Sequence, residues 1–589
     1  MPIPPHQFND RQPLFAPTAR PRKLLSFARL TALAAAVSGL CFGYEIGIVD
    51  AVLAMPTFQA FFATNASVDG WIVSSFLMGC LFGTSLVSFA ADRYGRKPCL
   101  LVGASLFVLG GAAQTAAGGV ASLCLGRALS GSGIGILSMA APLYICEVAA
   151  PAERGALIAL QQLLITVGIL AASIANAGLY TLGGALGDAQ WRAALAAQTA
   201  PGLLLLLLAA PLPRSPRWLV MVGRGEEAAG VLARLREAEA GSEGVLAELA
   251  GIRAELGGEG LLGGGEGAGA VELGELGGSD TLGEAAPALG GRAALASLPT
   301  ARPPPALTLR AYCARVAALF EPGMRRRTLV VCGLQFFQQW TGINVILYFA
   351  ARLFERAGAD ATHAATSLVV ANAALLVAGT LISMRLIDAP GVGRRALLLY
   401  GAAAMAACHG CVALFVGLAD RVPQGSAGGT ALSTLAVGCM LGFTLAFSAT
   451  WGPVVWVLQN EMLPLHVRAQ GCALGTAVCV GRPAGAETHG ARGAGMSHLT
   501  PHTHFHAHTH FRSNWASNAV IGKVAPLLIE AISEYTFALY GVMCAAMLLF
   551  VALSVRETAG VALEDMEALY GGGDAALGRM GAGGVVAAH

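Results

Sequence analysis

Residues 147–154 read EVAAPAER, and residues 461–468 read EMLPLHVR. Each string follows a long apolar segment, and each begins with a glutamate and ends with an arginine after six intervening residues. Matched spacing at matched positions is what an internal duplication leaves in a sequence. The two strings therefore predict a chain made of two related halves.

A second pair of strings agrees with the first. DRYGRK at 92–97 follows the second apolar segment of the N-terminal half, and DAPGVGRR at 388–395 follows the second apolar segment of the C-terminal half. The alternative is that the charged residues of these four strings only set the membrane topology. That alternative does not explain why the spacing from glutamate to arginine is the same in both halves. Two six-helix bundles related by an axis along the membrane normal are the expected architecture.

Counting outward from these strings gives six apolar segments, a long gap and six more. A spanning helix needs roughly 20 apolar residues, so each segment is long enough to cross a bilayer. The predicted fold class is an all-α membrane protein with twelve transmembrane helices arranged as two six-helix bundles. The segments lie near 28–55, 71–90, 99–117, 121–146, 156–180, 193–212, 327–354, 364–387, 396–419 and 430–459, in a broken stretch from 469, and near 536–555.

The composition of the 589 residues supports a membrane protein, because 55% are hydrophobic and only 12% are charged. A soluble domain carries roughly 25% charged residues. The net charge is +2 and no basic run is interleaved with aromatic residues, so nucleic acid is excluded as an expected partner. The 13 cysteines lack the clustered spacing of a disulfide framework and are interpreted as packing residues.

The basic residues predict the orientation of the chain. Lys and Arg precede the first apolar segment and recur in every second loop, whereas the alternate loops contain few of them, with Arg356 and Arg421 as mild exceptions. Under the positive-inside rule both termini are expected in the cytoplasm. Asn65 begins the only N-x-Ser/Thr glycosylation sequon and falls in the first external loop, where a glycan is expected in a eukaryotic host.

The segments predict a division of the chain into five parts. Residues 1–23 form a cytoplasmic tail, 24–215 the first bundle, 216–326 a cytoplasmic linker with short helices and low complexity, 327–558 the second bundle, and 559–589 a second cytoplasmic tail.

A His-rich insertion, 479–513, interrupts the eleventh apolar segment. Its alternating histidines are a biased tract rather than a metal site, since no set of acidic or cysteine partners accompanies them. Removing the insertion would join 469–478 to 514–532 as one apolar helix. Either the insertion loops out and leaves a shorter span beginning near Asn514, or it is translated non-coding sequence that the working protein lacks.

Amide side chains within the apolar segments predict a polar ligand. Gln162 lies in the fifth segment, and Gln335, Gln338, Gln339 and Asn344 lie in the seventh. The i, i+3, i+4 spacing of the three glutamines places their amides on one helical face. A sugar hydroxyl both donates and accepts hydrogen bonds, as an amide does, so such a face suits a hydrophilic ligand. A lone amide would more often link two helices.

Glu45 lies deep in the first segment, about 25 Å from its inner end at 1.5 Å per residue. A carboxylate inside a bilayer costs at least ~2.5 kcal/mol unless it is paired or protonated, and it is a functional candidate by default. Arg127 lies near the outer end of the fourth segment, so the two charges can share a depth.

With these strings placed on segments, the chain resembles the sugar porter family of the major facilitator superfamily over nearly all of residues 24–565, apart from the low-complexity and His-rich insertions. Several of the matching strings are long and typical of that family. They are FGYE at 42–45, DRYGRK at 92–97, GRALSGSGIG at 126–135, PLYICE at 142–147, RGAL at 154–157, QQLLITVGIL at 161–170, SPRWL at 215–219, QFFQQWTGIN at 335–344, WGPVVW at 451–456, NWASN at 514–518 and ETAG at 557–560.

The resemblance implies roles for individual residues. The implied sugar contacts are Gln162, Gln338, Gln339, Asn344, Asn372, Trp456, which stacks on the sugar, Asn514 and Asn518. Gln335 is added to them because its spacing places it on the same amide face. The implied gate residues are Tyr348 and Phe349, and the implied proton-coupling pair is Glu45 with Arg127. The Gly452–Pro453 pair is assigned to the gate because it breaks helix hydrogen bonding where a span must bend. The implied cytoplasmic charge network is Asp92, Arg93, Arg96, Glu147, Arg154, Arg217, Asp388, Arg394, Arg395, Glu461 and Arg468. Arg214, RETAG at 556–560 and the DAPGVGRR loop depart from the family pattern within that network.

Three functions follow from these observations. The first is proton-coupled symport of a monosaccharide, a hexose such as glucose, by alternating access. The second is an uncoupled carrier for hexoses or for polyols such as inositol, and the third is a transporter-like sugar sensor. No enzyme motif is present: there is no nucleophile elbow, phosphate loop or zinc-protease helix. The expected partners are a sugar and the lipid bilayer, with no cofactor or metal beyond the coupling proton, and the expected location is the plasma membrane rather than an internal membrane.

Overall fold

The computed structural model describes residues 26–150, 153–260, 316–387, 389, 391–423, 426–463, 514–533, 535–558 and 569–570. Within these ranges the chain is helical and contains no β-strand. Arg154 is described by its backbone alone. Asp388, Arg468 and the His-rich insertion lie outside the described residues.

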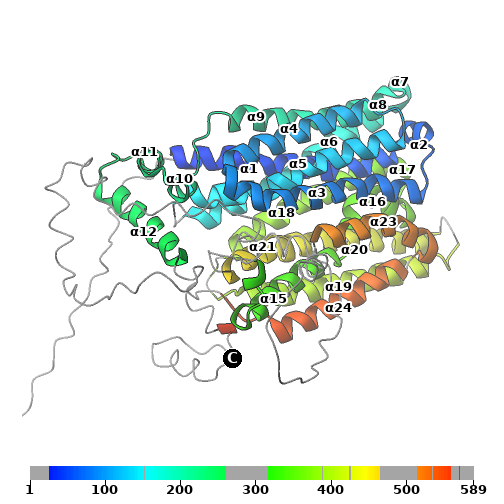
Figure 1. The fold of residues 1–589 in the computed structure, drawn as a ribbon. Helices are drawn as coiled ribbons and strands as arrows, with labels where there is room; N and C mark the ends of the chain where they lie inside the picture. Colours follow the sequence, from blue (N-terminus) through cyan, green and yellow to red (C-terminus); the bar gives the residue numbers. More distant parts are fainter. Residues whose placement is uncertain are drawn as a thin grey trace, which may run out of the picture.

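The N-terminal half contributes six spans, which lie together in one layer of Figure 1. They are α1 (Phe27–Ala54), α3 (Ala66–Tyr94), α4 (Arg96–Thr115), α5 (Val120–Val148), α6 (Arg154–Thr181) and the consecutive helices α8 (Ala189–Ala197) and α9 (Thr199–Ala209). The short helices α2 (Pro56–Phe62) and α7 (Gly183–Leu186) connect spans at one end of the bundle.

The C-terminal half forms the second layer in Figure 1. Its helices are α15 (Pro322–Gln339), α16 (Ile343–Arg356), α17 (Ala361–His363), the π-helix η2 (Ala364–Leu368), α18 (Val369–Leu386), α19 (Arg394–Ala419), α20 (Ala427–Ala449), α21 (Trp451–Met462), α23 (Asn514–Ile532) and α24 (Tyr535–Ser554). Eleven helical stretches of the described chain are long and apolar enough to span a membrane. One predicted span, the seventh along the chain, is missing from these eleven because it is divided between α15 and α16. With it the spans number twelve, so the predicted fold class is confirmed.

The seventh span is broken, whereas the sequence predicts one apolar segment near 327–354. Gln335, Gln338 and Gln339 lie together in α15, which ends at Gln339, while Asn344 lies in α16, which begins at Ile343. Gly342 between them has φ +91°, a conformation that glycine adopts without steric cost. Non-helical backbone at membrane depth persists where it is buried in protein, and Thr341 is fully buried.

Small residues bring the helices of each bundle close together. A Cβ atom added to Gly43 of α1 would lie 1.8 Å from the carbonyl oxygen of Ile165 in α6. One added to Gly135 of α5 would lie 2.2 Å from the carbonyl oxygen of Cys80 in α3. Membrane helices associate through such close backbone packing because lipid supplies no hydrophobic driving force between them.

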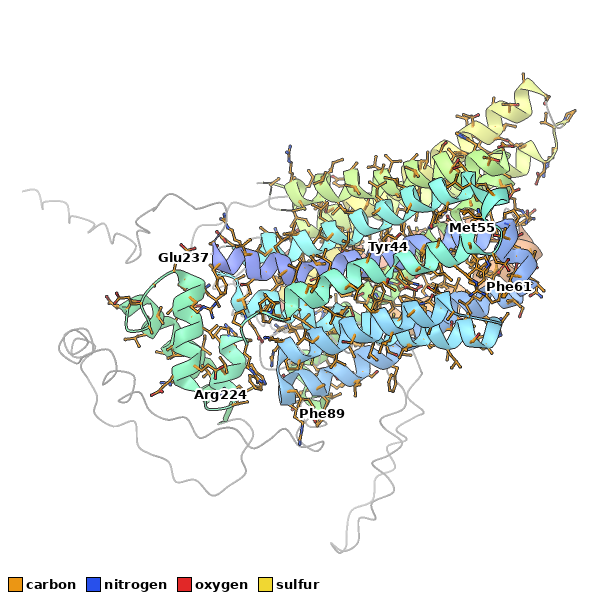
Figure 2. The ribbon with its side chains drawn as sticks, turned by 90° about the horizontal axis from the view of Figure 1, so that it is seen from above. Tyr44, Met55, Phe61, Phe89, Arg224 and Glu237 are labelled. Carbon is orange, nitrogen blue, oxygen red and sulfur yellow. The ribbon has the colours of Figure 1, made fainter. Side chains whose placement is uncertain are left out.

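Three short helices pack against one end of the bundles: α10 (Pro216–Met221), α11 (Gly225–Arg236) and α12 (Glu243–Gly260). The sequence predicts short helices in the linker at 216–326, and these three helices lie within that linker. Figure 2 shows Arg224 and Glu237 at this end and Met55 and Phe61 at the opposite end. We call the end with α10 to α12 the linker side and the opposite end the loop side.

Candidate functional site

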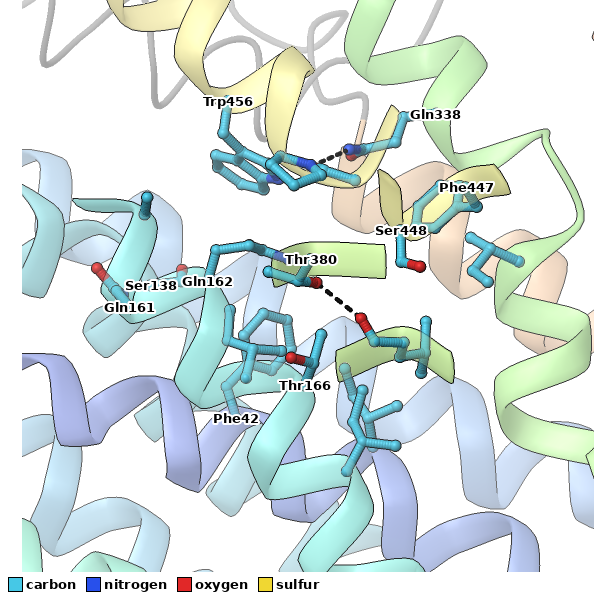
Figure 3. A pocket seen from close by; sticks show the side chains of 18 of the residues that line it. Phe42, Ser138, Gln161, Gln162, Thr166, Gln338, Thr380, Phe447, Ser448 and Trp456 are labelled. Carbon is cyan, nitrogen blue, oxygen red and sulfur yellow. Dashed lines mark hydrogen bonds between the residues drawn. The ribbon is translucent and has the colours of Figure 1, made fainter. Parts of the chain in front are cut away.

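A cavity of about 190 Å³ lies between the two halves. This volume is several times the ~30 Å³ that one water molecule occupies, so the cavity has room for a small molecule. Figure 3 shows Gln162, Thr166 and Phe42 of the N-terminal half facing residues of the C-terminal half across it. Its walls also reach Ile158, Ile387 and Val457, close to the linker-side ends of α6, α18 and α21.

Four amides of the C-terminal half form a connected set on the cavity wall. Asn344 donates through Nδ2 to Gln339 Oε1 at 2.6 Å, and Gln339 donates through Nε2 to Gln338 Oε1 at 3.3 Å. Asn514 Nδ2 lies 3.4 Å from the same Gln338 oxygen. Because each amide orients its neighbour, donors and acceptors face the cavity in fixed positions, which suits a ligand covered with hydroxyl groups.

The structure brings most of the predicted sugar contacts to this cavity. The lining residues among them are Gln162, Gln338, Gln339, Asn344, Trp456, Asn514 and Asn518. The buried Asn518 Oδ1 has no hydrogen-bond partner in the described chain, so it is an acceptor that a ligand can use.

Gln335 and Asn372 lie behind the wall instead of on it. Gln335 donates to Gln459 Oε1 at 2.6 Å and accepts from Asn514 at 2.6 Å, so it supports a lining residue. Asn372 accepts from Thr444 Oγ1 at 2.7 Å and links α18 to α20. These two amides connect helices, which is the alternative role for an amide within a span.

Several lining residues could not be found by sequence reasoning. Ser138, Thr166, Thr380 and Ser448 carry hydroxyl groups around the cavity. A hydroxyl in a membrane helix commonly donates to its own backbone, as Thr380 does to the Leu376 carbonyl at 2.8 Å. Serine and threonine in an apolar segment therefore give no signal of which ones face a ligand.

The tenth span is also broken beside the cavity. α20 ends at Ala449 and α21 begins at Trp451, with Thr450 at φ −131° and ψ −82° between them. Gly452 and Pro453 fall in the first turn of α21 and line the cavity, so the bend expected at this pair lies immediately before it. Gln338 Nε2 donates to the Trp451 and Gly452 carbonyls at 3.0 and 3.2 Å, which joins the two broken spans.

The aromatic residues expected at the gate lie on the loop-side part of the seventh span. Tyr348 and Phe349 are buried, and neither lines the cavity. Phe349 has non-helical angles of φ −138° and ψ 25°, so α16 is kinked there. The half-helix α16 therefore has a break at its start and a kink in its middle.

Contacts between the halves close the loop side just beyond this kink. Arg352 of α16 pairs with Asp69 of α3 at 2.6 Å, and the Asp69 side chain is only 1% exposed. The Ala351 amide donates to Asp50 Oδ1 of α1 at 3.1 Å. We call Asp50, Asp69, Ala351 and Arg352 the loop-side latch. The sequence alone does not identify these four residues as a latch, although a carboxylate within an apolar segment is in general a candidate for a functional residue.

Glu45 and Arg127 meet inside the N-terminal bundle. Glu45 Oε1 lies 3.2 Å from Arg127 Nη1, and their side chains are 0% and 3% exposed. Arg127 also donates through Nε to the Ile72 carbonyl at 2.6 Å. Phe42 and Ile46 of α1 line the cavity while Glu45 does not, so the pair lies directly behind the wall. Removing one partner of such a pair would leave a charge buried and unpaired, which is costly.

Charged residues cluster at the linker side of each half. In the first, Arg96 pairs with Glu147 at 2.9 Å and with Asp92 at 3.5 Å, while Arg93 is exposed beside the ring of Tyr94. Ser215, two residues before the half-buried Arg217, donates to Glu147.

In the second half, Arg394 pairs with Glu461 at 3.3 Å. The Arg394 and Arg395 amides donate to Glu557 at 2.9 and 3.1 Å, so this carboxylate caps the start of α19. Glu557 belongs to the RETAG string, which thus keeps its acidic residue in contact with the cluster. Arg214, another of the three departures, lies over the Trp218 ring at 5.0 Å.

One remaining expectation concerns a single residue, Asn65. Asn65 is exposed at the loop side and caps α3, accepting from the Val68 amide at 3.0 Å, so its side chain is accessible. In the parts of the chain that the structure describes, no group of three or more His, Cys, Asp or Glu side chains is placed to hold a metal ion.

Comparison with known proteins agrees with the fold. The sequence model of the family described as "Sugar (and other) transporter" matches residues 31–262, 308–481 and 506–570. The chain is 29% identical to the arabinose-proton symporter of Escherichia coli K12, over 93% of this chain and 95% of that protein. It is 28% identical to the galactose-proton symporter of the same organism, over 90% of this chain and 92% of that protein.

A solved structure shows the same fold. The proton:xylose symporter XylE bound to 6-bromo-6-deoxy-D-glucose superimposes with a TM-score of 0.66 at 24% identity, covering 92% of this chain and 99% of the other. The matched residues of the family leave out 263–307 and 482–505, which lie within the two insertions expected from the sequence.

Proposed function

This chain belongs to the family of sugar transporters, and on that premise we propose that it carries a monosaccharide, a hexose such as glucose, across the membrane together with a proton. It is a transport protein and not an enzyme. The single observation that carries the proposal is the connected set of amides on a cavity between two helical bundles.

The proposed sugar site uses both halves of the protein. Gln162 of α6 faces Gln338, Gln339 and Asn344 across the cavity, and Trp456 offers an aromatic face on which an apolar face of the sugar ring can stack. Each hydroxyl that loses water on entry needs a partner that donates and accepts, which amides provide. Asn514 and Asn518 complete the polar wall from α23.

The proposed transport cycle uses the latch and the cavity in turn. With the loop-side latch closed, the cavity walls extend towards the linker side, and the sugar exchanges there. Separation of Arg352 from Asp69 and of Ala351 from Asp50 opens the loop side. We place the linker side in the cytoplasm, because the clusters around Arg96 and Arg394 lie there and basic residues favour that face. The proposed location is the plasma membrane.

Glu45 is proposed to carry the coupled proton. Its protonation would remove the charge that holds Arg127, directly behind the wall formed by Phe42 and Ile46. The symporters for arabinose and galactose that this chain resembles support coupling. An uncoupled hexose or polyol carrier is the alternative of similar mechanism. A sugar sensor is the alternative of a different class, and no described feature of this chain favours it.

A substrate panel tests the proposed class of ligand. Purified protein in liposomes preloaded with unlabelled sugar should exchange labelled D-glucose, and D-xylose and D-galactose should compete with it. The expected result is saturable exchange with a hexose and none with a disaccharide. Exchange with inositol and with no hexose would replace the proposal with the polyol carrier.

The latch yields a conformational prediction. Changing Arg352 to Gln should speed hydrogen exchange in α16 and at the start of α3 about fivefold, because ion pairs that are partly exposed contribute up to ~1 kcal/mol. The matched control is Arg356→Gln on the same helix, whose partner Ser533 belongs to the same half at 3.0 Å. Hydrogen exchange measured by mass spectrometry compares the two. Equal exchange in both variants would show that Arg352 does not hold the halves together.

A further inference from the structure

The broken turn between α15 and α16 has a backbone carbonyl that its own helices do not satisfy. The Thr341 oxygen accepts a hydrogen bond from His409 Nε2 of α19 at 2.8 Å. Since a carbonyl only accepts, the proton of this imidazole is on Nε2. Cys544 of α24 also points its thiol at the same oxygen, at 3.7 Å, but a thiol is a weak donor.

Several other polar groups of the turn are paired locally. Thr341 Oγ1 donates to the Gln338 carbonyl at 2.8 Å, and the Ile343 amide donates to Thr341 Oγ1 at 3.3 Å. The Trp340 amide donates to the Phe336 carbonyl at 3.3 Å, while the buried Trp340 indole N–H has no hydrogen-bond partner in the described chain. The Thr341 carbonyl receives its strong donor from another span, and an unsatisfied carbonyl at membrane depth is costly.

The surroundings of His409 fix its ring against the turn. The side chain is 2% exposed, and its ring packs on Phe443 with centroids 4.4 Å apart. A Cβ atom added to Gly342 would lie 3.0 Å from His409 Nε2 and 3.0 Å from Tyr540 Cγ. The ring thus fills the space that a side chain at position 342 would need, on the residue whose φ of +91° makes the break.

The break lies between the amides of the cavity wall. Gln338 and Gln339 are the last residues of α15, and Asn344 is the second residue of α16. The 2.6 Å hydrogen bond from Asn344 to Gln339 spans the break, so its geometry depends on how the turn is held. His409 is not a lining residue of the cavity.

We propose that His409 is a positioning residue for sugar binding, which fixes the turn at residues 340–342 so that Gln339 and Asn344 form one binding face across it. The inference rests on the proposed function in that it takes this cavity as the sugar site. His409 acts through the Thr341 carbonyl and does not contact the sugar.

Two variants of His409 separate its hydrogen bond from its packing. His409→Phe keeps an aromatic ring against Phe443 and removes the donor, whereas His409→Gln keeps an amide donor at a similar reach. Loss of one buried partner corresponds to about tenfold in affinity. With D-glucose and D-xylose as probes in calorimetry, His409→Phe should bind about tenfold more weakly, and His409→Gln should stay within about threefold of the unchanged protein. Met405→Leu, a buried position one turn earlier on α19, is the control for packing.

A double variant tests positioning against general destabilisation. Asn344→Ala should weaken binding about tenfold in the unchanged protein but less than about twofold in His409→Phe, because the face across the break is already lost there. Additive losses, equal losses for the Phe and Gln variants, or unchanged binding in His409→Phe would overturn the proposal. If the unchanged protein binds neither sugar, the proposed function fails, and that result is distinct from failure of the role of His409.

Discussion

Gln339→Ala is expected to weaken sugar binding at least tenfold in a protein that still folds. Gln339 accepts from Asn344 at 2.6 Å and donates to Gln338 at 3.3 Å, and it lines the cavity. Its removal takes away a contact to the sugar and leaves the Asn344 amide without its acceptor. Each buried polar group left unpaired costs about 1 to 3 kcal/mol, and ~1.4 kcal/mol corresponds to tenfold.

Calorimetry on monodisperse protein measures this effect. The matched control is Gln190→Ala, because Gln190 is equally buried and hydrogen-bonded, to Thr57 and to the Leu179 carbonyl, but does not line the cavity. The control should bind sugar normally. Unchanged affinity in Gln339→Ala, or an equal loss in both variants, would contradict the assignment of the site.

Glu45→Gln is expected to abolish accumulation of sugar against a gradient while leaving exchange intact. The amide has nearly the shape of a protonated carboxyl group but cannot take up or release the proton. Arg127 keeps its bond to the Ile72 carbonyl in the variant, so the bundle retains that link. One unit of pH difference is worth ~1.4 kcal/mol, so coupled transport of one proton supports about a tenfold sugar ratio, and the variant should fall to a ratio of about one.

Uptake and exchange are measured in the same preparation of liposomes. Glu153→Gln is the matched control, because Glu153 is a carboxylate of the same half that pairs with an arginine, Arg29 at 2.6 Å, but does not line the cavity. The control should accumulate sugar. Accumulation by Glu45→Gln would show that another group carries the proton, and loss of exchange as well would show that Glu45 is needed for the fold or the cycle itself.

The sequence predicted the architecture because membrane spans are a property of local composition. Twenty apolar residues in a row can only be buried in lipid or protein, and their count fixes the number of spans. The repeated strings around Glu147 and Glu461 predicted the duplication. The amides of the site were also predictable, since an amide within an apolar segment needs a reason to be there.

Features that depend on contacts between distant segments were not predictable. Nothing in the residue types distinguishes Gln339, which faces the cavity, from Gln335, which supports Asn514 behind it. The loop-side latch joins Asp69 to Arg352 across the two halves, and such a pair is visible only in a folded state.

The break in the seventh span could not be predicted from the sequence for a related reason. Gly342 is one of 76 glycines, and small residues are common wherever membrane helices approach each other. Only the structure shows that this one has a positive φ and that His409 supplies the hydrogen bond the turn lacks. A single histidine in an apolar segment carries no such information.

We propose that this protein couples sugar movement to a proton. Uptake of labelled D-glucose into proteoliposomes, with and without an imposed pH gradient, measures this coupling directly. With the outside more acidic by one unit, we expect a sugar ratio well above one that collapses when a protonophore is added. Uptake that ends at equal concentrations whatever the gradient, at every pH between 5 and 8, would contradict coupling and leave an uncoupled carrier.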